Sequence, residues 1–169
     1  METIRLRIAG VVRESIVDGP GLRHTIFCQG CEHACPGCHN PETWDLQGGE
    51  TVDGETLLQR IPIHPLISGI TFSGGEPFLQ APAVAGLAAY FKKLGLNIWV
   101  YTGYRWEDLM NRMDQPGYRE LLSVTDVLVD GPFIQSLRTT SHPFRGSSNQ
   151  RLIAVAQSLD SGAIVEWQP

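Results

Sequence analysis

The sequence of 169 residues has little of what would place a protein in a membrane or on nucleic acid. Its apolar runs are short and are interrupted by glycine, proline or charged residues, whereas a transmembrane helix needs about 20 apolar residues. Acidic residues outnumber basic ones by 18 to 13, so no overall positive charge would attract nucleic acid. The N-terminus, METIRLRIAG, lacks the apolar core of a signal peptide. We therefore expect a cytoplasmic protein with neither a membrane nor a nucleic-acid partner.

Cysteine is also scarce, and its placement is uneven. All four cysteines lie within eleven residues, at Cys28, Cys31, Cys35 and Cys38. Thiols stay reduced in the cytosol, so clustered cysteines there bind metal more often than they form disulfides. The turns that a loop needs to wrap around a metal centre are provided by Gly30, Pro36, Gly37 and Pro41. The segment 27–44 is therefore the first candidate for a functional site.

Three kinds of metal site can be weighed for this segment. Structural zinc sites usually pair two short Cys-x-x-Cys elements across a longer gap, whereas here all cysteines share one loop. A four-cysteine ferredoxin cluster would include Cys28, but the spacing differs from the usual one. The third kind uses only CEHACPGC, residues 31–38, and binds a [4Fe–4S] cluster through three thiolates. One iron then remains open for a small molecule.

Short apolar stretches alternate with helical patterns along the chain. Strands are expected at 4–12, 23–28, 68–72, 97–101 and 126–129, and helices at 52–60, 82–94, 106–113 and 117–122. Further apolar stretches at 152–156 and 164–167 follow a turn-rich segment. No repeat or linker is visible, so we expect a single domain over 1–169. This alternation predicts an α/β fold, a partial (incomplete) β/α barrel of mainly parallel strands.

Glycine-rich or polar motifs follow three of the predicted strands. They are Ser73-Gly74-Gly75-Glu76-Pro77, Thr102-Gly103 and Asp130-Gly131. Because ligands of parallel α/β sheets bind at the carboxyl ends of the strands, we expect these motifs and the cysteine loop to share one rim. The two glycines at 74 and 75 leave backbone groups unobstructed, and the Glu76 carboxylate suits a ligand's ammonium group.

In this order the motifs resemble the radical S-adenosylmethionine superfamily, and within it the small activating enzymes of glycyl-radical enzymes. RGSSNQR at 145–151 is similar to the branch that activates anaerobic ribonucleoside-triphosphate reductases. The other segments that carry the resemblance are DGPG at 18–21, the cysteine motif with Trp44, SGGEP at 73–77, YTGY at 101–104 and VLVDGPF at 127–133.

The resemblance implies an iron–sulfur oxidoreductase. Cys31, Cys35 and Cys38 would hold the [4Fe–4S] cluster, and S-adenosylmethionine would bind the fourth iron. Reductive cleavage of S-adenosylmethionine would give a 5′-deoxyadenosyl radical, which takes a hydrogen atom from a backbone glycine of an anaerobic ribonucleotide reductase. A separate flavodoxin- or ferredoxin-like protein would supply the electron.

The resemblance also implies which residues contact S-adenosylmethionine. The adenosyl part would lie against Gly37, Cys38 and His39. The methionine end would be contacted by Gly74, Gly75 and Glu76. Asp130 would add a second polar contact on the rim.

Two alternatives stay open at this point. The chain could activate another glycyl-radical enzyme of the pyruvate formate-lyase type, which the Glu76 of its GGEP segment favours. It could also be a non-enzymatic iron–sulfur or zinc protein that uses all four cysteines. For two other residues we expect structural positions: Cys28 as a packed strand residue and His33 as a solvent-facing loop residue.

Overall fold

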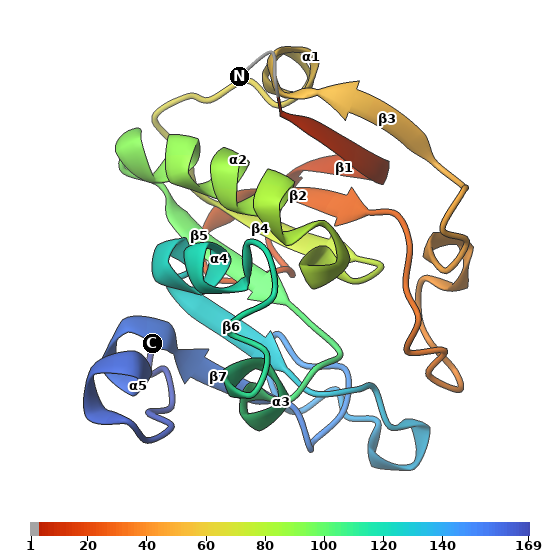
Figure 1. Ribbon diagram of the computed structural model, residues 1–169, viewed down its shortest axis with the longest axis vertical. Coiled ribbons are helices and arrows are strands. Elements are labelled where there is room, and N and C mark those ends of the chain that lie inside the picture. The colour runs from red at the N-terminus through yellow and green to blue at the C-terminus, as the bar shows by residue number, and fades with distance from the viewer. Residues whose placement is uncertain (1–3) are drawn as a thin grey trace.

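The computed structural model of the protein describes residues 4–169 and contains one seven-stranded sheet (Figure 1). The strand order is β3-β1-β2-β4-β5-β6-β7. The strands are β1 (Arg5–Ser15), β2 (Leu22–Cys28), β3 (Glu50–Asp53), β4 (Ile67–Gly74), β5 (Asn97–Tyr101), β6 (Val127–Asp130) and β7 (Arg151–Ala154). The central strands β2, β4, β5 and β6 pair in parallel. The pairings β1–β2, β1–β3 and β6–β7 are antiparallel.

This arrangement confirms the predicted α/β fold with a parallel centre. In the described residues the outermost strands, β3 and β7, do not pair with each other, so the sheet is not closed into a barrel. The antiparallel pairings at the two edges of the sheet were not predicted by the alternation of strands and helices in the sequence. The β1–β2 pairing is antiparallel because only the short segment 16–21 joins these two strands, a connection that antiparallel strands allow.

Helices connect the parallel strands and cover one face of the sheet. Helix α1 (Gly54–Arg60) precedes β4, α2 (Ala81–Lys93) joins β4 to β5, and both α3 (Trp106–Met110) and α4 (Tyr118–Val124) lie between β5 and β6. Helix α5 (Val155–Ser161) follows β7. Short 3₁₀ turns occur at η1 (Pro41–Thr43), η2 (Pro77–Gln80) and η3 (Gln135–Leu137). In residues 4–169 we find no helix with the length and apolar character needed to cross a membrane.

The main hydrophobic core lies between the sheet and these helices. Alternate residues of the parallel strands, among them Ile26, Phe72 and Val100, are fully buried there. They pack with the apolar stripe of α2, including Leu87 and Phe91. The opposite face of the sheet is more polar and aromatic, since neighbouring strand positions such as Thr71 and Trp99 point the other way.

Two stretches divide between elements that the sequence pattern did not separate, and the helix expected at 106–113 ends at Met110. The stretch 52–60 was expected to be all helix, but Glu50–Asp53 forms β3 and α1 begins at Gly54. Asp53 caps that helix as expected, because its carboxylate accepts a hydrogen bond from the Thr56 amide at 2.8 Å. The apolar stretch 152–156 divides between the end of β7 and the start of α5. Both strands are only four residues long, which is too short for a clear alternation of side chains.

Candidate functional site

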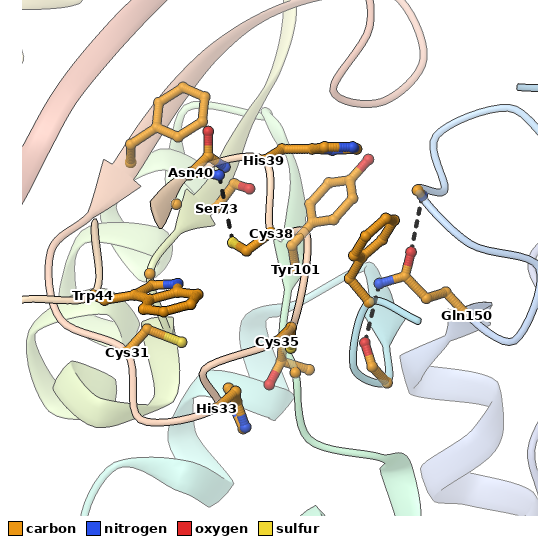
Figure 2. Close-up of a pocket in the computed structure, with 18 of the residues that line it drawn as sticks. Cys31, His33, Cys35, Cys38, His39, Asn40, Trp44, Ser73, Tyr101 and Gln150 are labelled. Carbon is orange, nitrogen blue, oxygen red and sulfur yellow. Dashed lines mark hydrogen bonds between the residues drawn. The ribbon is translucent and has the colours of Figure 1, made fainter. Parts of the chain in front are cut away.

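A cavity of about 340 Å³ lies at the carboxyl ends of the parallel strands. It is lined by three cysteines, Cys31, Cys35 and Cys38, which Figure 2 shows approaching it from successive parts of one loop. The strand ends contribute Ser73, Gly74, Gly75, Tyr101, Thr102, Gly103, Gly131 and Phe133. The structure thus confirms that the cysteine loop and the strand-end motifs share one rim.

The cysteine loop is held in shape largely by its own backbone. Where the chain enters the loop, the Gly30 amide donates to the Thr43 carbonyl at 2.7 Å and the Cys31 amide donates to the Trp44 carbonyl at 3.2 Å. The buried Gln29 side chain donates to two further carbonyls, those of Glu42 at 3.0 Å and Asp45 at 2.8 Å. These bonds tie the beginning of the loop to its end, so the cysteines lie on a closed turn of chain.

The segment that follows β4 is joined to the start of the cysteine loop. The Gly75 amide donates to the Cys28 carbonyl and the Glu76 amide donates to the Gly30 carbonyl, both at 2.8 Å. A Cβ atom on Gly75 would lie 2.3 Å from the Gly30 carbonyl oxygen, well inside van der Waals contact. Glycine is therefore required here by the close approach of two backbones.

Each of the three cavity thiols has a backbone amide beside it. Burial raises the pKa of the Cys31 thiol, and the His33 amide partly offsets this effect. Burial likewise raises the pKa of the Cys35 thiol, with the Phe133 amide acting against it. The Asn40 amide donates to the Cys38 sulfur at 3.4 Å (Figure 2). Amides directed at sulfur stabilise negative charge, as iron–sulfur clusters require of their thiolates.

The donor set fits an iron–sulfur cluster. Three thiols line one cavity, and each could bind a different iron of a [4Fe–4S] cluster. Within residues 4–169 we find no group of three or more His, Cys, Asp or Glu side chains arranged to bind a single metal ion.

Cys28 is not among the residues that line the cavity. Its side chain is fully buried at the end of β2 and belongs to the main hydrophobic core. Burial raises the pKa of its thiol far above the ordinary value, which disfavours the thiolate that metal binding needs. This confirms the expectation that Cys28 is a packed strand residue.

Among the residues predicted to contact S-adenosylmethionine, four line the cavity: Cys38, His39, Gly74 and Gly75. The His39 ring packs against the Phe133 ring with centroids 4.9 Å apart. Gly37 precedes Cys38, and a Cβ atom there would lie 2.9 Å from the Gln135 side chain. Glu76 and Asp130 do not line the cavity, and both are buried to 1% exposure by protein partners.

Asp130 is bound to Arg151 and to the start of α3. Its carboxylate accepts from the Arg151 Nε at 3.0 Å and from the Trp106 amide at 2.7 Å. The hydrogen bond to Asp130 raises the pKa of Arg151, with Glu107 as a second partner. Asp130 thus links β6, β7 and α3 just behind the cavity rim.

We expect Arg151→Met to lower the free energy of unfolding by about 2–4 kcal/mol, because it leaves the buried Asp130 carboxylate with the Trp106 amide alone. Urea denaturation of the metal-free protein measures this. Arg60→Met is the matched control, since Arg60 pairs with Glu50 on the exposed surface and should cost less than about 1 kcal/mol. Equal small losses of stability in both variants would contradict the role of Arg151 as the stabilising partner of the buried Asp130 carboxylate.

Sequence reasoning missed several residues of the rim. Gln150 holds the rim together by donating to the Gly131 carbonyl at 3.0 Å and accepting from the Gly146 amide at 2.9 Å (Figure 2). Phe133 and Tyr101 provide aromatic walls of the cavity. These residues lie in the segments VLVDGPF, YTGY and RGSSNQR, which were the available sequence signal for the rim. The sequence of these segments does not indicate which side chain faces the cavity.

His33 differs most from its expected position. Its side chain is 19% exposed rather than facing solvent, and its Nε2 lies 2.6 Å from the Glu76 Oε2. The hydrogen bond to Glu76 raises the pKa of this histidine, while burial acts in the opposite direction. The His33 ring also packs edge-on against Tyr104, with ring centroids 4.6 Å apart.

Known proteins are similar to this chain over most of its length. A family described as a 4Fe-4S single cluster domain matches residues 17–153. The anaerobic ribonucleoside-triphosphate reductase-activating protein of Salmonella typhi is 38% identical over 146 residues, which cover 80% of this chain and 90% of that protein. The protein of the same name from Escherichia coli K12 is 35% identical over 144 residues, with coverage of 80% and 90%.

Among solved structures, QueE from Escherichia coli is similar with a TM-score of 0.48 and 16% identity, covering 59% of this chain and 53% of that one. This likeness is too low to inform the site. The family match spans most of the chain, and the relatives are matched over nearly their full length. The chain therefore belongs to the 4Fe-4S single cluster domain family and, within it, to the radical S-adenosylmethionine enzymes named anaerobic ribonucleoside-triphosphate reductase-activating proteins.

Proposed function

We propose that this protein binds a [4Fe–4S] cluster through Cys31, Cys35 and Cys38, binds S-adenosylmethionine beside it, and generates a glycyl radical on an anaerobic ribonucleotide reductase. The observation that carries the proposal is the single cavity in which these three thiols meet the ends of the parallel strands. When bound, the reduced cluster supplies the electron that splits the sulfonium centre of S-adenosylmethionine into methionine and a 5′-deoxyadenosyl radical.

The chain's own residues bind the ligand and shield it from water. Gly74 and Gly75 present backbone groups to the methionine end, with Glu76 directly after them in the same segment. His39, supported by the Phe133 ring, and Cys38 with its neighbour Gly37 would border the adenosyl part. Asp130 does not line the cavity; it supports the rim from behind through its hydrogen bonds to Arg151 and the Trp106 amide. The aromatic walls keep water from the reacting atoms.

The partners follow from the chemistry. Relatives of this chain carry the name of the reductase that they activate, which supports an anaerobic ribonucleotide reductase as the target. All cysteines lie between positions 28 and 38, which suits one cluster. We therefore propose a separate flavodoxin- or ferredoxin-like electron donor and a cytosolic location, where these free thiols stay reduced.

The test is anaerobic reconstitution with iron and sulfide, followed by dithionite reduction and addition of S-adenosylmethionine. We expect 5′-deoxyadenosine, detected by chromatography, and a glycyl radical signal in electron paramagnetic resonance when an anaerobic ribonucleotide reductase is present. If 5′-deoxyadenosine forms but the glycyl radical appears only on a formate-lyase-type enzyme, the cleavage of S-adenosylmethionine is supported and the partner is that enzyme instead. A reconstituted cluster that yields no 5′-deoxyadenosine would contradict the proposal.

A further inference from the structure

Both carboxylate oxygens of Glu76 already accept hydrogen bonds from protein groups, so the side chain is not free to contact a ligand. Its Oε1 accepts from the Phe78 amide at 3.0 Å, and its Oε2 accepts from the Gly103 amide at 2.9 Å. The Thr102 hydroxyl lies 2.9 Å from both oxygens, and His33 completes the set. Among residues 4–169 no lysine or arginine pairs with this buried carboxylate, so these donors are what stabilises its charge.

Three of these donors belong to the scaffold at the ends of β4 and β5, whereas His33 belongs to the cysteine loop. His33 lies midway between Cys31 and Cys35 and lines the cavity. It is fixed from two further sides, by the Tyr104 ring and by Gly103, where a Cβ atom would lie 2.4 Å from the His33 ring. The backbone bonds described above tie the loop's two ends together, but they do not tie its middle to the sheet.

We propose that Glu76 and His33 form a positioning pair, which holds the loop between Cys31 and Cys35 against the ends of β4 and β5 and so fixes the thiolate geometry for the cluster. This inference rests on the proposed cluster ligands. It assigns the Glu76 side chain to the loop and leaves the backbone of Gly74 and Gly75 to meet the ligand. Glu76 and His33 act through the cysteines and are not catalytic residues.

A second consequence concerns the charge of Glu76. The buried Glu76 carboxylate lies near the thiolates and repels the negative charge that reduction adds to the cluster. The hydrogen bond that His33 donates to Glu76 weakens this repulsion. Removing the charge should therefore shift the cluster midpoint potential to more positive values. Removing His33 should shift it to more negative values. A role limited to general folding would not produce opposite shifts.

The experiment compares reconstituted wild-type protein with Glu76→Gln, His33→Ala and the double variant. We expect each single variant to lose its cluster to an iron chelator about tenfold faster, as the loss of an outer-shell partner typically costs. The double variant should be no faster than the faster single variant, because the two residues act as one unit. His33→Gln, which retains an N–H donor, should restore most of the cluster's lifetime.

His64→Ala and Glu14→Gln are matched controls, because His64 and Glu14 form an exposed histidine–carboxylate pair at 3.1 Å away from the cavity. Both should behave as wild type. Wild-type cluster lifetimes in Glu76→Gln and His33→Ala would overturn the inference. So would a Glu76→Gln protein with a normal cluster but weakened S-adenosylmethionine binding, which would assign Glu76 to the ligand's ammonium group. Failure of wild type itself to bind a cluster would instead refute the proposed function.

Discussion

Cys35→Ala is expected to abolish the iron–sulfur cluster, whereas Cys28→Ala should retain it. Cys35 lines the cavity with a backbone amide beside its sulfur, so its loss leaves one iron without a protein ligand. Cys28 is buried in the main core and its thiol strongly resists ionisation. Its truncation should lower the free energy of unfolding by about 1–2 kcal/mol, through the small cavity that it creates.

The measurement is iron and sulfide content with visible absorbance after anaerobic reconstitution, together with the yield of 5′-deoxyadenosine. Cys31→Ala and Cys38→Ala should match Cys35→Ala, since all three thiols surround the same cavity. Loss of iron from Cys28→Ala, in a protein that still unfolds cooperatively, would show four-cysteine ligation. That result would favour a non-enzymatic iron–sulfur protein.

Gly75→Ala is expected to weaken both folding and ligand binding. The added Cβ would meet the Gly30 carbonyl oxygen at 2.3 Å and the Cys28 carbonyl oxygen at 3.0 Å. The strand-end segment must then move away from the cysteine loop, which breaks the amide bond from Gly75 to Cys28. We expect a loss of about 2–3 kcal/mol in stability and at least about tenfold in S-adenosylmethionine affinity.

Gly10→Ala serves as the control for this variant. Gly10 lies in β1, and a Cβ atom there would meet no atom within 4 Å. Its effect on unfolding should stay within about 0.5 kcal/mol. Thermal unfolding and equilibrium binding to the reconstituted protein measure the two quantities. Unchanged binding by Gly75→Ala would mean that the segment 73–76 does not contact the ligand.

The rim could be predicted from the sequence because its parts follow strands with clear apolar patterns. Asn97–Tyr101 has the predicted bounds in the structure, since a run of large apolar residues ends directly at Thr102-Gly103. Once parallel strands are assigned, their ends must meet at one edge. The cysteine loop lies directly beside Gly74 and Gly75 because β2 and β4 are neighbours in the sheet, with Cys28 opposite Gly74.

The partners of the rim's charged residues could not be predicted in this way. His33 and Glu76 are 43 residues apart, and Asp130 and Arg151 are 21 residues apart. Whether a strand-end carboxylate turns into the cavity or behind it depends on loop backbone conformation, which the residue types at 76 and 130 do not encode. The antiparallel edges were missed for a related reason, since four-residue strands such as β3 acquire their structure from the neighbour with which they pair.

The self-contained cysteine loop has a consequence for damage by oxygen. Within the described residues, no side chain of the segment 29–49 belongs to either hydrophobic core. Oxidative destruction of the cluster would thus remove the group bound by the cysteine loop. The hydrophobic packing between the sheet and its helices would stay intact. The inactivated protein would be a folded scaffold ready to be reloaded, and recovery after exposure to air would be limited by the supply of iron, sulfide and reductant rather than by refolding.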